Sequence, residues 1–231
     1  MKSPKKVIAF LLLGVFGLTT LAAQDFYTTF ARGKWDRSLW FDVKSARRNY
    51  LKKMVQLDDH IMNAVPPDLT DKVIFSKYVD SVYSCIMLRK KYGMPSEITC
   101  TMSFDHRMAP LIVLAKDVGR SAKGEPEQRD HYEIILFDEG INVWHHVYNQ
   151  GKPKYRQAAF LKTKFLPRRK YKLRVRVTRD RKGKYMQIEC GGHTFGFMDE
   201  ALPETFYVGI IGCEGRNRFY DFGIRKTDGK P

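Results

Sequence analysis

Alternation between apolar and polar residues dominates the second half of the chain. Residues 171–178 (YKLRVRVT) place Tyr171, Leu173, Val175 and Val177 on one side and three basic residues on the other. This period of two is typical of a strand with one buried face. Similar short runs predict strands at residues 97–104, 110–116, 131–137, 141–148, 158–164, 185–190, 194–198 and within 206–226. Short strands at even spacing indicate an all-β fold, a two-sheet antiparallel β-sandwich or jelly roll.

Polar segments separate the predicted strands. Residues 119–129 contain Gly, Pro and several charges, so this segment is predicted to be a loop. Residues 138–140 (DEG) separate two apolar runs. They predict a three-residue hairpin turn in which Gly140 takes the left-handed position.

The first third of the chain is less regular. Residues 35–43 and 50–56 are predicted to be strands on either side of a basic turn. Apolar residues near helical spacing predict a short helical insertion over residues 69–78, with Asp68 as its N-cap. The segment that follows, up to residue 91, fits either a helix or a strand.

The first 23 residues have the features of a secretory signal peptide. Lys2, Lys5 and Lys6 precede an apolar run, and small residues precede Gln24. We expect a secreted or periplasmic protein with no stable membrane span after cleavage. Residues 24–231 would be one domain, in which 24–96 supply N-terminal strands and the helix and 97–231 form the main sandwich.

The positive charge of the chain indicates what kind of partner it binds. The chain has a formal net charge of +16, so an exported protein of this kind is expected to attract anions such as acidic polysaccharides. Export and the use of aromatic residues in the core argue against nucleic acid as a partner.

Four cysteines lie within apolar stretches without CxxC spacing, which favours buried free thiols over zinc ligands. An oxidising compartment would also permit disulfides, whose pairing the spacing leaves open.

Residues 97–225 resemble a known fold family. The resemblance is carried by the segments YKLRVRVTRDRKGKYMQIECGGHTFGF, MDEALPETFYVGIIG and RFYDFGIR, in that order. They resemble the concanavalin A-like jelly roll of lectins and glucanases, in exported bacterial forms near the 3-keto-disaccharide hydrolase-like domains of unknown function. The Glu-x-Asp-x-x-Glu motif of laminarinase-type enzymes and the Gln-Ile-His strand of alginate lyases are absent. The resemblance therefore implies a fold and leaves the activity open.

Two neighbouring strands carry the first candidate site. In residues 131–137 (HYEIILF), the more apolar alternate positions should face the core, which directs His131 and Glu133 to the opposite side. A His and a Glu on one face can act as proton donor and acceptor. Trp144 and His146 share a face of the next strand, where an aromatic ring could stack on a sugar. Both sets could equally be ordinary core or surface residues.

Three loops carry further candidates. Asp58, Asp59 and His60 could act as acid and base or bind a structural calcium, whose oxygen ligands are common in this fold family. Arg107 could contact the carboxylate of a uronic acid or form an internal ion pair. A tight loop near the C-terminus supplies a candidate groove rim, made of Glu214, Arg216, Asn217 and Arg218.

These features lead to three hypotheses of different classes. The first is an exported carbohydrate-binding protein for acidic, plant or host polysaccharides. The second is a glycoside hydrolase or polysaccharide lyase, with Glu133 paired with Asp59 or Glu214, or with His131 paired with Arg107. The third is a structural or interaction module of the cell envelope. The sequence does not decide whether the protein is an enzyme.

Overall fold

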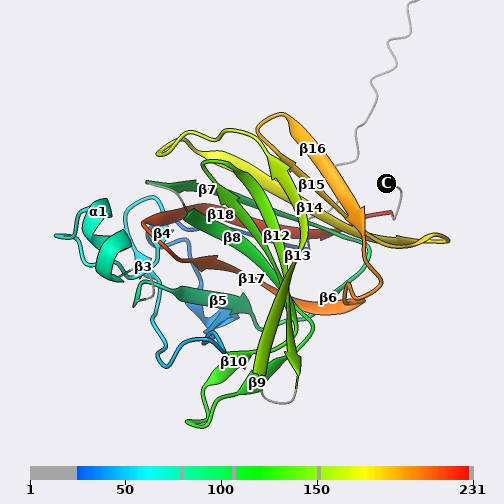
Figure 1. Cartoon of the computed structure of the whole chain (residues 1–231), viewed down its shortest axis with the longest axis horizontal. Coiled ribbons are helices and arrows are strands. Elements are labelled where there is room, and N and C mark those ends of the chain that lie inside the picture. Colours follow the sequence, from blue (N-terminus) through cyan, green and yellow to red (C-terminus); the bar gives the residue numbers. More distant parts are fainter. Residues whose placement is uncertain (1–24, 79–80, 106–107, 150–151, 229–231) are drawn as a thin grey trace, which may run out of the picture.

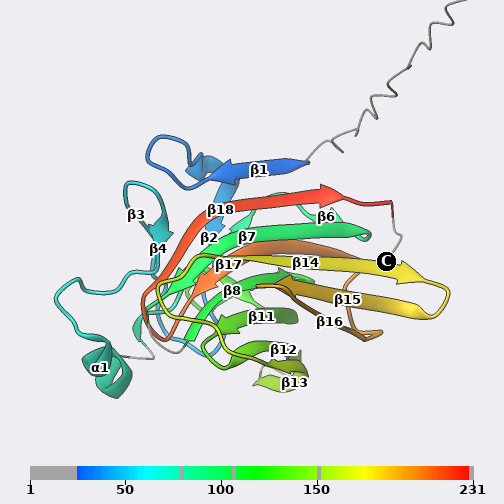
Figure 2. The same ribbon diagram turned by 90° about the horizontal axis from the view of Figure 1, so that it is seen from above.

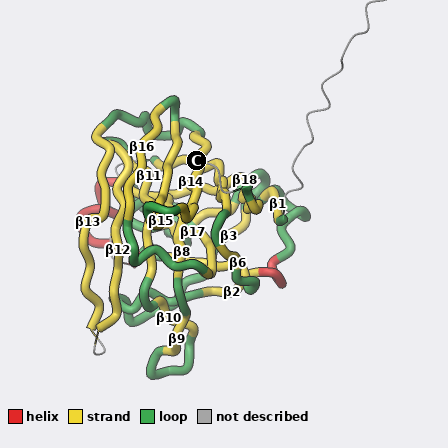
Figure 3. Tube along the Cα trace, turned by 90° about the vertical axis from the view of Figure 1, so that its right-hand side faces the viewer, coloured by secondary structure: helices red, strands yellow, loops and turns green. Residues whose placement is uncertain are grey.

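The computed structural model describes residues 25–78, 81–105, 108–149 and 152–228, and strands make up nearly all of its regular secondary structure (Figures 1 and 3). The predicted signal peptide lies outside the described residues. The strands are β1 (Phe26–Thr29), β2 (Trp40–Asp42), β3 (Val55–Gln56), β4 (Ile61–Met62), β5 (Ser84–Leu88), β6 (Tyr92–Gly93), β7 (Ser96–Phe104), β8 (Met108–Ala115), β9 (Val118–Arg120), β10 (Pro126–Gln128), β11 (His131–Phe137), β12 (Gly140–Asn149), β13 (Lys152–Lys162), β14 (Tyr171–Asp180), β15 (Gly183–Cys190), β16 (His193–Met198), β17 (Thr205–Gly212) and β18 (Asn217–Lys226).

Two antiparallel sheets form the predicted jelly-roll sandwich (Figure 2). The first sheet has the order β16-β15-β14-β7-β18-β4-β3, and β1 also pairs with β18. The second has the order β13-β12-β11-β8-β17-β5-β2, and β6 also pairs with β17. Strands from the first third of the chain therefore lie in both sheets and complete their edges.

The main core lies between the two sheets and follows from the alternation of the strands. Leu173, Val175 and Val177 are fully buried in it, while Arg174 and Arg176 reach the outer face of the first sheet. This confirms the predicted orientation of β14. Phenylalanine side chains from three further strands, β7, β17 and β18, pack against the same cluster.

A second apolar cluster lies on the outer face of the second sheet. Cys85, Leu111, Val113 and Ile135 belong to it. It is partly covered by the β9–β10 hairpin, which Lys44 joins through backbone hydrogen bonds to Pro126 and Gln128. The prediction that 119–129 is a loop was therefore wrong, because turn residues Ser121 to Gly124 separate two short strands.

The N-terminal third differs from expectation in its details. The predicted strands over 35–43 and 50–56 shrink to β2 and β3, and Arg37–Leu39 is a 3₁₀ helix. The predicted helix over 69–78 is instead one short α-helix, α1 (Asp71–Val73), continued by a π-helix (Ile74–Tyr78). Its N-cap is Thr70, whose hydroxyl accepts a hydrogen bond from the backbone of Val73, and not Asp68.

Smaller predictions can also be checked. Phe137 pairs directly with Gly140, so Asp138 and Glu139 form a two-residue turn, with Gly140 at φ +147°. The four cysteines are free thiols, as favoured by their apolar surroundings. Among the described residues, no helix has the length and apolar character that a membrane crossing requires.

Candidate functional site

Strands β11 and β12 bring four of the predicted site residues to one face. His131 pairs with His146 across the two strands, and Glu133 pairs with Trp144. The intervening Tyr132 points into the core between the sheets. His131, Glu133, Trp144 and His146 therefore lie on the outer face of the second sheet, in the orientation expected from the sequence.

His131, Glu133 and His146 form a buried cluster on that face. Nε2 of His131 lies 3.3 Å from one oxygen of Glu133, and Nε2 of His146 lies 3.2 Å from the other. The two imidazole rings are stacked, with centroids 4.5 Å apart and planes 3° from parallel. All three side chains are almost fully buried.

Burial and charge shift the pKa values of this cluster in opposite directions. Burial would raise the pKa of the Glu133 carboxyl, but the neighbouring His146 and His131 outweigh it and hold this pKa well below its usual range. Burial lowers the pKa of His146 more than the Glu133 carboxylate raises it. The cluster thus places an ionised carboxylate between two imidazoles.

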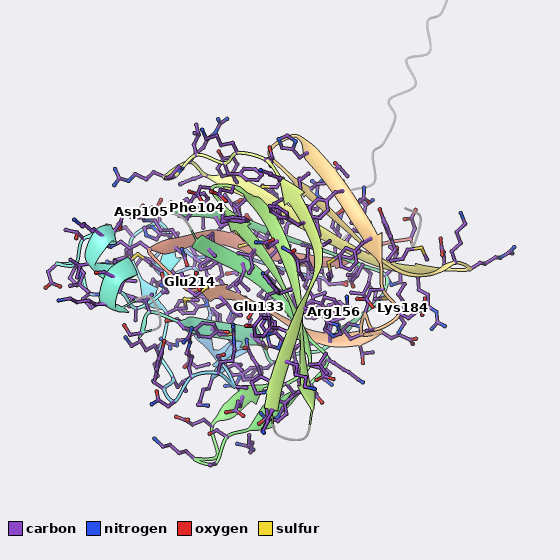
Figure 4. All side chains as sticks on the ribbon, viewed as in Figure 1. Phe104, Asp105, Glu133, Arg156, Lys184 and Glu214 are labelled. Atoms are coloured by element: carbon purple, nitrogen blue, oxygen red, sulfur yellow. The ribbon has the colours of Figure 1, made fainter. Side chains whose placement is uncertain are left out.

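A small pocket of about 190 Å³ opens above this cluster. Glu133, Trp144, His146 and Glu214 line it, and Figure 4 shows Glu133 and Glu214 in the same region of the molecule. The structure therefore brings one residue of the predicted C-terminal rim to the predicted strand residues. The exposed ring of Tyr155 lies edge-on to Trp144, with centroids 5.7 Å apart, and also lines the pocket.

The basic residues of this pocket come from the N-terminal third. Arg47 and Arg48 line it, and the guanidinium of Arg47 lies 5.7 Å from the ring centroid of Tyr155. Sequence reasoning missed all three residues. The basic turn at 44–49 was a visible signal, but nothing in the sequence places that turn over β12 and β13.

A larger groove of about 660 Å³ opens beside the same outer face, at the β2–β5 edge. Its charged lining consists of Arg37, Lys53, Arg89, Arg120 and the single acid Asp42. We call it the basic groove. A groove of this size falls within the range of ligand sites in proteins.

Four aromatic side chains line the basic groove together with aliphatic ones. The aromatic residues are Trp35, Trp40, Phe41 and Tyr207, and the others are Leu51, Ile86, Val118 and Pro126. Phe41 and Tyr207 pack edge to face with centroids 5.8 Å apart, and both belong to the outer-face cluster. Trp35 also lines the groove, and the guanidinium of Arg37 lies 5.3 Å from its ring centroid. Sequence reasoning did not select these residues, because they come from segments far apart in the chain.

A third pocket, of about 560 Å³, lies on the opposite side of β11 and β12. The rings of Tyr132 and His145 stack there at 4.2 Å, and Tyr132 donates a hydrogen bond of 2.8 Å to Asp199. Arg156 also binds Asp199. Burial lowers the pKa of His145, an effect that the charge of Arg156 increases.

The other predicted acid and base pair lies elsewhere. His60 Nδ1 is 2.5 Å from Asp59, which also pairs with Lys170 at 3.4 Å, while Asp58 pairs with Arg32. Asp59 and His60 do not line the pocket around Glu133. Arg107 lies outside the described residues. The structural calcium stays a prediction.

The remaining residues of the predicted rim hold loops together and do not line the pocket. Arg216 binds Asp71 at 2.9 Å and the carbonyls of Pro66 and Leu69. Asn217 accepts a hydrogen bond from the backbone of Cys213. Arg218 binds Asp105. These contacts give Arg216, Asn217 and Arg218 a structural role in joining β18 to neighbouring segments.

Comparison with solved structures supports the expected fold family. The carbohydrate binding module CBM66 from Bacillus subtilis matches with a TM-score of 0.55 and 9% identity, over 81% of this chain and 96% of that one. A seed lectin from Lotus tetragonolobus matches with a TM-score of 0.57 and 10% identity, over 89% and 99%. An endo-β-galactosidase from Clostridium perfringens matches with a TM-score of 0.56 and 9% identity, over 90% and 64%. The fold is thus a concanavalin A-like jelly roll.

Comparison at the level of sequence gives no family. No protein-family model and no curated protein matches the chain. The narrower resemblance to 3-keto-disaccharide hydrolase-like domains is not confirmed. Because the structural matches are so distant in sequence, they carry information on the fold alone.

Proposed function

We propose that the protein is an exported carbohydrate-binding jelly-roll protein that holds an acidic polysaccharide in the basic groove. The observation that carries this proposal is the lining of that groove, in which four cations and a single acid stand beside four aromatic side chains. Flat rings match the apolar faces of sugars, and guanidinium groups match carboxylates or sulfates. The three similar structures named above include a carbohydrate-binding module and a lectin.

The pocket above Glu133 would extend this binding surface. It is smaller than the basic groove, and the exposed ring of Tyr155 with Arg47 offers one further sugar contact. Export through the predicted signal peptide would place the protein in the periplasm or outside the cell, where such polysaccharides occur.

Binding assays with matched polysaccharides test the proposal. The protein should bind polygalacturonate or alginate more tightly than dextran or laminarin, and added salt should weaken the binding of the acidic chains. The double variant Arg37→Ala, Lys53→Ala should bind them about tenfold more weakly, because two charge contacts of up to about 1 kcal/mol each are lost.

The chain offers a control with the same change in charge. The double variant Arg181→Ala, Lys182→Ala removes two exposed cations from the turn between β14 and β15, away from the groove. If both double variants lose affinity equally, the groove is not the site and the attraction is a general effect of net charge. Absence of binding to every polysaccharide would instead favour an envelope-interaction module.

A glycoside hydrolase is the second candidate, because Glu133 and Glu214 line one pocket. Such enzymes use two carboxyl groups on opposite sides of the scissile bond. Mass spectrometry of the same incubations would reveal released oligosaccharides, and the variant Glu214→Gln should abolish them. A lyase acting with Glu133 and His131 would be recognised by unsaturated products. Binding of polysaccharide without released products would favour the carbohydrate-binding protein over an enzyme.

A further inference from the structure

Strands β11 and β12 bring three metal-ligating groups together beside the small pocket, which Glu133 and His146 line. One ligand atom from each of His131, Glu133 and His146 lies within 4.8 Å of the others. His131 and Glu133 lie two positions apart on β11, and His146 lies opposite His131 on β12. Since neighbouring strands hold their side chains at fixed spacing, the cluster is positioned by rigid elements.

The hydrogen bonds of His131 show which ring nitrogen carries the proton. Its Nδ1 lies 2.5 Å from the carbonyl oxygen of Arg129, which can only accept a hydrogen bond. Nδ1 is therefore the donor. In a neutral ring, Nε2 then presents a lone pair to the carboxylate oxygen of Glu133 at 3.3 Å. Two acceptors facing each other in a buried site repel, unless the imidazole carries a second proton or a metal cation stands between them.

His146 presents a related difficulty on the other side of Glu133. Its Nε2 is buried 3.2 Å from the carboxylate, but without hydrogen-bond geometry, and it has no hydrogen-bond partner among the described residues. Buried polar atoms without a hydrogen-bond partner are rare in folded proteins, and a bound ion is one explanation for them. In both neutral imidazoles, therefore, Nε2 points at the Glu133 carboxylate without donating a hydrogen bond to it.

We propose that His131, Glu133 and His146 bind a divalent transition-metal ion of the zinc class. Two imidazoles and a carboxylate are ligands that such ions accept, and three protein ligands leave a coordination position open, here towards the pocket. Nδ1 of His131 already donates to a backbone carbonyl, which is the usual second contact of a metal-binding histidine. Calcium is excluded as the preferred ion, because it takes six to eight oxygen ligands.

Metal binding would require a small local adjustment. Bonds of about 2.0 to 2.2 Å to zinc place tetrahedral ligand atoms roughly 3.3 to 3.6 Å apart. The contacts from each histidine to a Glu133 oxygen already have about this length, so only the wider separations within the 4.8 Å cluster would have to shrink. The two stacked rings would also tilt out of their parallel arrangement, because a metal lies in the plane of each imidazole that binds it. This proposal does not depend on polysaccharide binding in the basic groove.

Direct metal titration tests the site without any sugar. The full protein, freed of metal with a chelator, is titrated with Zn²⁺ by calorimetry and with Co²⁺ by visible absorption. One ion should bind per chain, and the Co²⁺ spectrum should have the intensity of a four- or five-coordinate site. The variants Glu133→Gln and His146→Ala should weaken binding by at least about 100-fold, since changes in the outer shell alone cost 10- to 100-fold.

Two controls separate this site from adventitious binding. His193→Ala removes an exposed histidine on β16, and Cys213→Ser removes the thiol that lines the pocket. Both should bind the ion as the unaltered protein does. Glu133→Gln keeps the size of the side chain, and thermal unfolding checks that it folds, while Zn²⁺ should raise the melting temperature only where the site is intact. No one-to-one binding, or binding that survives Glu133→Gln and His146→Ala, would overturn the proposal and leave a protonated His131 as the partner of Glu133.

Discussion

Arg218 holds the buried carboxylate of Asp105 with two hydrogen bonds, of 2.5 Å from Nη1 and 3.0 Å from Nη2. Asp105 directly follows β7, and Arg218 lies near the start of β18, its partner in the first sheet. This bidentate pair joins residues 113 positions apart in the chain. The pair joins β7 to β18 at the end of the sandwich where Arg216 contacts Asp71 of α1.

Replacement of Asp105 by Asn should destabilise the fold. Removing one partner of a buried pair leaves the other charge uncompensated, which costs about 3 to 5 kcal/mol for full burial. We expect about 2 to 3 kcal/mol, because the Arg218 side chain keeps some contact with solvent. Urea unfolding measures the difference. Asp59→Asn, which alters a largely exposed acid, should change the free energy of unfolding much less.

Asp105 should also make the fold sensitive to acid. Burial would raise the pKa of this carboxyl, but Arg218 and Arg168 hold it below the ordinary value of 3.8. As the pH falls through that value, the unfolded chain takes up a proton before the folded one, so this part of the stability is lost in that range and below. Above about pH 5 the contribution should be complete.

Unfolding curves at several pH values check this sign. The free energy of unfolding should fall more steeply between pH 5 and pH 3 in the unaltered protein than in Asp105→Asn, which has already lost the pair. Parallel curves for the two proteins would contradict the role of Asp105 and assign the acid sensitivity to other buried carboxylates.

Strands with one buried face could be predicted from the sequence, and so could the face on which His131 and Glu133 lie. Tyr132 and Ile134 are apolar and enter the core, which directs their neighbours outward. Edge strands escaped this reasoning. Strand β13 begins at Lys152, six residues before its predicted start, because its first half lies exposed at the sheet edge and shows no apolar alternation.

Contacts between distant segments could not be predicted at all. The charges of Arg216 and Arg218 were visible, but their partners Asp71 and Asp105 are more than one hundred positions away. Arg47 and Tyr155 meet only because the basic turn folds over the outer face of the second sheet. A single sequence identifies which strand face a residue occupies, and the tertiary fold decides which residues share a site.

Glu97 should be the acid that stabilises the basic strand β14 most. Its buried carboxylate lies 2.8 Å from Arg176 and 2.8 Å from Arg225, and 3.7 Å from Arg174. Glu97→Gln should therefore lower the free energy of unfolding by about 2 to 3 kcal/mol, since these cations would repel one another at partly exposed positions. Glu189→Gln removes a more exposed partner of Arg174 and should cost less. Equal effects of the two variants in urea unfolding would show that burial of Glu97 adds nothing.

The cysteines should behave as free thiols that the fold protects. Cys85, Cys100 and Cys190 are buried, and burial raises the pKa of Cys100 well above its usual range and that of Cys190 to about 12. Because the thiolate is the reactive form, these three thiols should react with a thiol reagent only after unfolding. Cys213 is half-buried, but burial also raises its pKa well above the usual range, so it should react only slowly before unfolding. In guanidinium chloride without reductant, four thiols per chain should be counted, and added reductant should leave the melting temperature unchanged. A count of two or none would mean that disulfides form after export and that the free-thiol arrangement is wrong.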